Sequence, residues 1–288
     1  MNTIRFSLVF LLLLAGTFGV RDARAAESYD NCTGFVDTLP AQIGTQGTWC
    51  LRKDLSTAQA SGNAIYITTN NVTLDCNGFK LGGLAAGTGS TAYGVFAYGM
   101  TNLTVRNCNV RGFWAGINLF ASNSLVEDNS LDGNLYIGIQ LLGIANQVLR
   151  NTVYNTGGGT NSSQSFGLRV TGDSNGNGGG RVLDNTVAGV FGTTVDTSPV
   201  GIFLQGAGLE AARNRVRGLV VAGGGFARGI YAGVGVTVDR NHVAQAADTN
   251  GDGIASYTGS MFCSRNTVAN FSNAYAGCGA NLGNLTLP

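Results

Sequence analysis

The chain has 288 residues, of which 45 are Gly and only 3 are Pro, and 44% are hydrophobic. A disordered Gly-rich chain would be poor in apolar residues, so this composition excludes disorder and favours many short strands joined by tight turns. The formal net charge of +1 excludes the strongly basic balance that is typical of nucleic-acid-binding proteins.

The first element predicted along the chain is an export signal. Arg5 supplies a positive charge, residues 6–20 are mostly apolar, and Ala23-Arg24-Ala25 is a small-x-small cleavage site. The apolar run is short for a membrane span, and no later segment is apolar enough to span. We therefore predict a signal peptide over residues 1–25 and a secreted or periplasmic mature protein. An uncleaved anchor is the alternative.

Export makes the six cysteines candidates for disulfide bonds. One candidate pair lies before the regular repeats described next and would staple an N-terminal cap, and a second lies near the other end. A third pair then remains by elimination. In that order the predicted pairs are Cys32–Cys50, Cys263–Cys278 and Cys76–Cys108. Other connectivities stay open, because six cysteines permit several.

An internal repeat begins with a small residue followed by a branched one. These pairs are Gly94-Val95, Gly116-Ile117, Gly138-Ile139, Gly167-Leu168, Gly201-Ile202, Gly229-Ile230 and Gly253-Ile254. Downstream of each lies the pattern V-x-x-N-x-V. Its Asn column reads Asn77, Cys108, Asn129, Asn151, Asn185, Asn214, Asn241 and Asn266. Apolar residues stand three positions before this column and two positions after it, the later set beginning at Phe79.

The pattern of this repeat excludes two other kinds of solenoid. Helical solenoids need continuous 3.6-residue patterning and helix caps, and leucine-rich repeats need a Leu-x-x-Leu-x-Leu frame. What remains is a coil of three short strands and three turns, stacked on copies of itself about 4.8 Å apart. The sequence thus predicts an all-β parallel β-helix of about eight coils over residues 61–271. An N-terminal cap with the first coil would occupy residues 26–60, and a C-terminal cap residues 272–288.

In such a stack the Asn column should form a ladder. Asn tolerates the left-handed backbone of a tight corner, and its amide can hydrogen-bond the Asn of the next coil. Cys108 interrupts the column and should leave Asn129 with one partner missing. The positions just before the column are Asn107, Asp128, Arg150, Asp184, Arg213, Arg240 and Arg265. Their alternating charges predict a surface ion ladder, and attraction of an anionic polymer by the last three Arg is the alternative.

The segment N-V-T-L-D-C-N-G at residues 71–78, together with these coils, resembles the right-handed parallel β-helix repeat proteins of bacteria. The resemblance covers roughly residues 45–275 and places the chain near the broad pectin-lyase-like group. It implies right-handedness and kinship with polysaccharide lyases, hydrolases and epimerases. The motif is specific for the fold and not for an activity.

One outward sheet face is unlike an ordinary solvated face. Side chains alternate along a strand, so the residues after each inward Ile or Val of the first strand point outward. The predicted saccharide-binding residues on this face are Phe96, Tyr98, Asn118, Phe120, Gln140, Arg169, Phe203, Gln205, Tyr231 and Tyr257, with Leu142 and Thr171 beside them. Aromatic rings stack on sugar rings, and amides hold hydroxyl groups. Outward residues covered by loops, or a surface for self-association, are the alternatives.

Long loops are predicted at both edges of this first sheet. Those that lead into it span residues 157–165, 192–199 and 221–227, and one at its other edge spans residues 172–180. Loops on both edges would wall a groove over the middle coils, near Arg169.

The chemistry available on this face is limited. A glycoside hydrolase needs two carboxylates, and the predicted face carries none. A lyase needs a base near the acidic C–H of the sugar and a group that neutralises the uronate, either Arg or Ca²⁺. Arg169 lies where the base of a lyase would, so it is the candidate catalytic residue. The alternative is that Arg169 binds saccharide or pairs with Asp173.

Two segments fit the calcium-loop pattern D-x-[DN]-x-[DN]-G, in which alternate oxygens surround a hard cation. One contains Asp248, Asn250 and Asp252, and the other runs over residues 173–178. Neither is followed by the Glu that completes an EF-hand loop, and Asn, Asp and Gly also suit any turn. Ca²⁺ is therefore a candidate cofactor with an incomplete motif. His242, the only His, is predicted on the third sheet beside Arg215, with a surface role.

These observations lead to two functional hypotheses. The first is an exported protein that binds a polysaccharide, with acidic polymers among the candidates, along its first sheet, and that acts as a polyuronate lyase if Arg169 is catalytic. The second is a non-catalytic structural or adhesive protein of the cell envelope. Neither requires nucleic acid or a membrane span, and the sequence does not indicate the oligomeric state.

Overall fold

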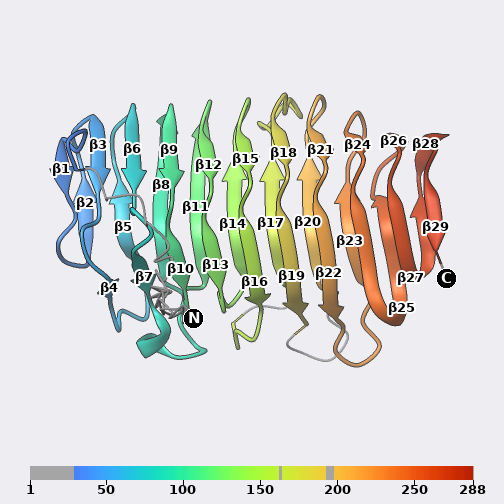
Figure 1. Ribbon diagram of the computed structural model, residues 1–288, viewed down its shortest axis with the longest axis horizontal. Coiled ribbons are helices and arrows are strands. Elements are labelled where there is room, and N and C mark those ends of the chain that lie inside the picture. The colour runs from blue at the N-terminus through green and yellow to red at the C-terminus, as the bar shows by residue number, and fades with distance from the viewer. Residues whose placement is uncertain (1–28, 162–163, 193–197, 288) are drawn as a thin grey trace, which may run out of the picture. The chain divides into compact units, whose positions relative to one another are not determined.

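Each turn of the chain consists of three short strands, and strands of successive turns pair in parallel (Figure 1). The computed structural model describes residues 29–161, 164–192 and 198–287. The predicted signal peptide lies outside these residues. One turn runs through β14 (Ile137–Leu142), β15 (Gln147–Leu149) and β16 (Thr152–Thr156) and returns in β17 (Phe166–Thr171), where Leu168 lies beside Ile139.

Three stacks of strands result, here called the first, second and third sheets. The first contains β2 (Ala41–Ile43), β5 (Asn63–Ile67), β8 (Tyr93–Thr101), β11 (Ala115–Ser122), β14, β17, β20 (Val200–Gln205), β23 (Ala227–Ala232) and the later parts of β25 (His242–Ser256) and β27 (Thr267–Ala276). The second contains β1 (Gly34–Phe35), β3 (Gly47–Cys50), β6 (Val72–Asp75), β9 (Leu103–Arg106), β12 (Leu125–Glu127), β15, β18 (Arg181–Leu183), β21 (Glu210–Ala212), β24 (Thr237–Asp239), β26 (Met261–Ser264) and β28 (Cys278–Leu282). The third contains β4 (Leu55–Ser56), β7 (Lys80–Gly82), β10 (Asn109–Arg111), β13 (Ser130–Asp132), β16, β19 (Thr186–Phe191), β22 (Arg215–Val220), the early parts of β25 and β27, and β29 (Leu285–Leu287). A short 3₁₀ helix, η1, spans Leu84–Ala86.

The predicted all-β parallel β-helix is confirmed, and it is longer than expected, with about nine turns. The additional strands lie in the segments predicted as caps. Strand β3 pairs with β6 in the same parallel register as the repeats, and β28 pairs with β26. These turns lack the Gly-Ile and V-x-x-N-x-V signals, so the pattern could not count them.

The core follows the predicted columns. The residues three positions before the Asn column are fully buried, because each lies directly beside its equivalent in the next turn. The other column starts one position off the prediction, since Leu81 and not Phe79 pairs with Val110. The turn between β6 and β7 holds two more residues than the turn between β9 and β10. Asn77 therefore lies outside the ladder, and its Nδ2 donates to the carbonyl oxygen of Leu51.

The Gly column is required by packing. A Cβ built on Gly201 would collide with Cγ1 of Val216 and lie 2.6 Å from the carbonyl oxygen of Gly229. Equivalent collisions with the next Val of the core occur at Gly138, Gly167 and the later members of the column. Only Gly, which has no side chain, leaves room for the Val of the third sheet and for the backbone of the next turn.

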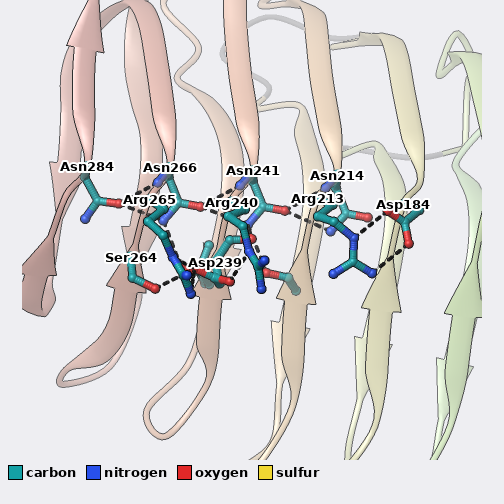
Figure 2. A network of polar contacts seen from close by, with 12 residues as sticks. Asp184, Arg213, Asn214, Asp239, Arg240, Asn241, Ser264, Arg265, Asn266 and Asn284 are labelled. Atoms are coloured by element: carbon teal, nitrogen blue, oxygen red, sulfur yellow. Dashed lines mark hydrogen bonds and ion pairs between the residues drawn. The ribbon is translucent and has the colours of Figure 1, made fainter.

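The Asn ladder is present and extends one turn further, to Asn284 (Figure 2). Each Oδ1 accepts hydrogen bonds from the backbone N–H and the Nδ2 of the preceding Asn, as Asn241 does from Asn214 at 2.9 Å in both cases. At Cys108 only the backbone N–H donates to Asn129, at 2.9 Å. Asn129 thus lacks only the hydrogen bond that a side-chain amide at position 108 would have donated, as predicted.

The left-handed corner was assigned to the wrong residue. The residue before each ladder position, and not the Asn itself, has φ between 53° and 59° in the turns from Asn107 to Arg265. The Asn therefore keeps an ordinary backbone and turns its side chain inward to the ladder.

The corner residues form the predicted ion ladder. Arg150 pairs with Asp128 at 2.8 Å, and Arg213 pairs with Asp184 at 2.8 Å. Arg240 and Arg265 both reach the nearly buried Asp239 (Figure 2). Although burial raises the pKa of Asp239, hydrogen bonds from Ser264 and the two guanidinium groups bring that pKa below its usual range. These Arg charges are thus satisfied within the fold.

All three predicted disulfides are present. They are Cys32–Cys50, Cys76–Cys108 and Cys263–Cys278. The second links two neighbouring turns inside the core, where both of its cysteines are buried.

Candidate functional site: the outward face of the first sheet

The register brings nearly all the predicted binding residues into two rows. The first row runs Phe96, Asn118, Gln140, Arg169, Phe203 and Tyr231, each paired with the next across neighbouring strands. The second row runs Tyr98, Phe120, Leu142, Thr171 and Gln205. Tyr257 is outside both rows, because Ala255 is the register partner of Tyr231. Its ring instead stacks on Phe203 with centroids 5.4 Å apart.

Aromatic rings form a continuous chain along this face. It links Tyr66, Phe96, Tyr93, Trp114, Tyr136, Phe166, Phe203, Tyr231 and Tyr257, with neighbouring centroids between 4.5 and 6.0 Å apart. The sequence prediction missed five of these residues. Four of them, Tyr93, Trp114, Tyr136 and Phe166, precede a repeat Gly by one or two positions. That spacing was a usable signal, but the prediction considered only residues after the Gly.

Part of this series of aromatic rings covers a small apolar cluster outside the main core. Ala115, Ile137, Phe166 and Val200 lie under the rings of Trp114, Tyr136 and Phe203. The rings at the turn into the first sheet are therefore anchored by packing, while other rings stay accessible. Tyr98, at the far end of the face, is 63% exposed.

Buried polar atoms without hydrogen-bond partners gather on the same face. Asn118 is only 2% exposed, and its Oδ1 has no partner in the described part of the chain. The same holds for Trp114 Nε1, Arg169 Nε, Thr171 Oγ1 and Arg228 Nε. Each such atom costs about 1–3 kcal/mol of stability when it stays unpaired, so a cluster of them calls for an explanation.

Two guanidinium groups on this face lack a carboxylate partner. Arg169 lies 5.4 Å from the ring centroid of Phe166 and 5.6 Å from that of Phe203. Arg228, which the sequence prediction missed, lies 4.7 Å from the centroid of Tyr231. Among the described residues, no Asp or Glu oxygen lies within 4.0 Å of either guanidinium.

The alternative pairing of Arg169 with Asp173 is therefore not formed. Asp173 is engaged within its own loop, where Oδ1 accepts the N–H groups of Asn175 and Asn177 at 2.9 Å. The side chain and backbone N–H of Asn177 hold the pKa of this carboxyl below its usual range. The carboxylate thus stabilises the loop, and no described acidic residue pairs with Arg169.

Loops bound the face at both edges. A pocket of about 590 Å³ lies between Tyr98, Phe120 and Leu142 of the sheet and Asp173 and Ser174 of the loop. At the other edge, Asn161 Nδ2 donates to the carbonyl oxygen of Gly89, at 2.8 Å. Nearby, the Phe226 N–H donates to Ser198 Oγ at 3.3 Å. Of the predicted loops, residues 162–163 and 193–197 lie outside the described part of the chain.

The candidate calcium ligands lie on one strand, where β25 passes from the third sheet to the first. Asp248, Asn250 and Asp252 lie along the extended strand β25, where alternate residues are about 6.5 Å apart. Asp252 instead accepts a hydrogen bond from Asn273 at 2.9 Å. The described ranges contain no group of three or more His, Cys, Asp or Glu suited to a metal ion. The predicted loop is part of a strand in this structure, and calcium binding at it stays a prediction.

His242 lies where it was predicted. It is exposed on the third sheet with Arg215 as its register partner, away from the first-sheet face. It contributes nothing to the candidate site.

Comparison with known proteins agrees with this geometry. The family model for the right-handed beta helix region matches residues 45–195, which is more than half of the chain. The chain belongs to this right-handed β-helix family. No curated protein sequence matches it.

Solved structures share the β-helix fold at low identity. The enzymatically active domain of tailspike protein 2 from bacteriophage CBA120 is 12% identical, with a TM-score of 0.54 over 90% of this chain and 41% of that one. Pectate lyase Pel9A is 13% identical, with a TM-score of 0.50 over 88% of this chain and 62% of that one. The A-module of mannuronan C-5 epimerase AlgE6 from Azotobacter vinelandii is 13% identical, with a TM-score of 0.49 over 88% and 80%. The chain thus spans less than two thirds of the tailspike domain and of the lyase.

Two further observations concern the compartment. Within the described residues, no helix is both long and apolar enough to cross a bilayer. Three disulfide bonds are typical of proteins that fold outside the cytoplasm.

Proposed function

We propose that the chain is an exported protein that binds a polysaccharide along the outward face of its first sheet. The observation that carries this proposal is the unbroken series of aromatic rings beside the partly exposed polar side chains of Arg169 and Gln205. Sugars present apolar ring faces and hydroxyl groups that both donate and accept hydrogen bonds. A bound chain would therefore stack on the rings and hydrogen-bond accessible polar side chains of the same rows, such as Gln205.

The ligand class is an acidic polymer. Arg169 and Arg228 are unpaired guanidinium groups beside aromatic rings, and a guanidinium binds a carboxylate through two parallel hydrogen bonds. A uronate carries its carboxylate on the same ring that would stack. Pectate lyase Pel9A shares the fold, which agrees with this class without establishing it.

Cleavage is a separate step of the proposal. The described outward rows carry no pair of carboxylates for glycoside hydrolysis. Arg169 is the candidate catalytic residue of a lyase. Its protonated guanidinium would neutralise the uronate carboxylate and so acidify the neighbouring C–H. Hydroxide from solvent would take that proton, the C–O bond to the leaving sugar would break, and the leaving oxygen would take a proton from water. The test is ultraviolet absorbance from unsaturated uronate, measured on pectate and alginate with and without Ca²⁺. The activity should disappear in Arg169→Ala, and silence with every polymer would leave a binding protein.

Affinity electrophoresis against pectate and alginate tests the binding proposal. Phe203→Ala and Tyr231→Ala should each weaken retardation about five- to tenfold, because each removes a stacking surface. Phe262→Ala is the matched control, since Phe262 is exposed on the second sheet. Equal retardation of all four proteins would refute the proposal, provided that thermal melts show that the variants fold.

The competing function is a structural or adhesive rod of the cell envelope. Leu282, Leu285 and Leu287 are exposed on strands β28 and β29, and such residues favour contact with another protein or a second copy. Light scattering coupled to size exclusion decides between the two functions. A strict monomer that binds the polymer supports the first, and a concentration-dependent oligomer without polymer binding supports the second.

A further inference from the structure

A second hollow lies on the third sheet. It has a volume of about 460 Å³ and is lined by Tyr154, Asn155, Ala188, Gly189, Arg217, Gly218, Ala244, Gln245 and Ala246. This volume is in the range of small-ligand sites, about 300–1,000 Å³. The hollow belongs to strands β16, β19, β22 and β25 and shares no residue with the first-sheet rows.

The register explains why the surface is hollow there. Tyr154, Ala188, Arg217 and Ala244 are neighbours across successive strands, so large and small side chains alternate. Gly189 and Gly218 follow two of them with φ of 75° and 65°, where a side chain would be strained. A floor of Ala and Gly thus lies between one aromatic ring and one guanidinium group.

The two side-chain amides of the lining are occupied, and its guanidinium group is not. Gln245 Oε1 accepts the N–H of Leu219 at 3.0 Å, and its Nε2 donates to the carbonyl oxygen of that residue at 2.8 Å. Asn155 Nδ2 donates to Asp132 Oδ1 at 3.0 Å. Arg217 makes no ion pair with any described residue, and no carboxylate lines the hollow.

The charged side chains on the hollow's own strands, from β16 to the early part of β25, are basic. Asp132 on the neighbouring strand β13 is acidic, but it pairs with Arg111 at 3.2 Å. Arg215 lies two residues before Arg217 on the same outward face of β22, and it too forms no ion pair with a described residue. His242 is the register partner of Arg215 on the next strand. From β16 to β25, the outward rows of this sheet carry Thr, Tyr, Ala, Arg and His and no acidic residue. The hollow therefore attracts an anion.

We propose that this hollow is a second saccharide site, which takes a single hexuronate unit. Tyr154, 38% exposed, supplies a stacking surface for the sugar ring, and Arg217 pairs with the carboxylate. The small floor admits the ring between these two groups. The site lies on a different sheet from the groove of the proposed function, so either can exist without the other.

Calorimetric titration of the whole chain with sodium D-galacturonate tests this inference. The background is an Arg169→Gln/Phe203→Ala variant, which removes the first-sheet contribution. Saturable binding should persist in that background, weaken about tenfold on Arg217→Gln and weaken severalfold on Tyr154→Ala. Lys53→Gln is the charge-matched control and should change nothing, because Lys53 is exposed between β3 and β4.

Two ligands control for chemical class. D-galactose, which lacks the carboxylate, should bind at least tenfold more weakly than galacturonate. Inorganic phosphate should bind more weakly as well, because it offers no ring to Tyr154. The inference is wrong if the background variant shows no saturable binding or if Arg217→Gln binds unchanged. It is equally wrong if galactose or phosphate binds as tightly as galacturonate. Loss of polymer binding in the first-sheet variants bears only on the proposed function.

Discussion

At the scale of single residues, the corner before each ladder Asn places Arg where Gly would be expected. A left-handed conformation costs an L-residue about 1–2 kcal/mol, yet Arg150, Arg213, Arg240 and Arg265 all adopt it. Each of these side chains reaches an acidic residue on the outside, while the following Asn binds the ladder on the inside. Hydrogen bonds on both sides thus determine the corner and offset the cost.

The ladder itself should contribute strongly to stability. Asn214 is fully buried, and its side chain takes part in four hydrogen bonds, with Asn185 N–H and Nδ2, Val182 O and Asn241 Oδ1. Asn214→Ala leaves buried donors and acceptors unpaired, so the free energy of unfolding should fall by about 3 kcal/mol in chemical denaturation. Gln42→Ala removes an exposed amide and should change it by less than about 0.5 kcal/mol. Equal effects of the two changes would contradict this role of the ladder.

At the scale of elements, alternation along the strands let the sequence predict the fold and much of the face. A period of two assigns each residue after Gly-Ile to one side of the sheet, so the amino-acid sequence alone was enough to place Asn118, Gln140 and Arg169 in one row. The turn lengths could not be predicted in the same way. Two extra residues between β6 and β7 displaced Asn77 and Phe79 without any change in the surrounding pattern.

Other features of the site depend on contacts between turns. The D-x-N-x-D-G segment suits a loop locally, but pairing of β25 with β23 and β27 holds it extended. The sequence also could not show that Arg169 and Asp173 do not pair. Asp173 lies only four residues after Arg169, but Asn175 and Asn177 bind its carboxylate. The local sequence specifies which residues share a face of the sheet. Contacts between turns determine which of these side chains find a hydrogen-bond or ion-pair partner.

The Gly column gives a prediction about element packing. Gly201 does not have a left-handed φ, so Gly201→Ala acts only through the collision of the new Cβ with Val216 and the Gly229 carbonyl oxygen. Overpacking of this kind should lower the free energy of unfolding by about 2 kcal/mol. In a Val216→Ala background the cost should be smaller, and a double-mutant cycle measures the difference. Gly44→Ala, whose Cβ would lie 3.7 Å from Thr68 Oγ1, is the control and should be nearly neutral. Additive effects at Gly201 and Val216 would contradict the packing explanation.

At the scale of the whole molecule, the stack separates its charged side chains by face. The corner after the second sheet carries an ion ladder whose charges are satisfied internally. The first and third sheets instead present unpaired Arg beside aromatic rings. Because the net charge is only +1, these cationic surfaces are local features and not the result of a basic chain. Ligand binding on either face need not disturb the ladder that holds the turns together.

Stability along the stack should also be local, because each turn contacts only its neighbours. Among the described strands of the second sheet, β28 pairs with β26 alone, while β15 is held on both sides. The Cys263–Cys278 bond fastens β28 and closes a loop with a sequence separation of 15, which should stabilise it by about 3 kcal/mol. Cys263→Ala/Cys278→Ala should therefore remove hydrogen-exchange protection from β26 and β28 and leave β14 and β17 protected. Cys76→Ala/Cys108→Ala is the comparison. It opens a bond beside β6 and β9, so protection should fall in these strands and their neighbours and stay unchanged in β26 and β28. If both variants lost protection uniformly along the chain, the turns would form one cooperative unit rather than a stack of nearest neighbours.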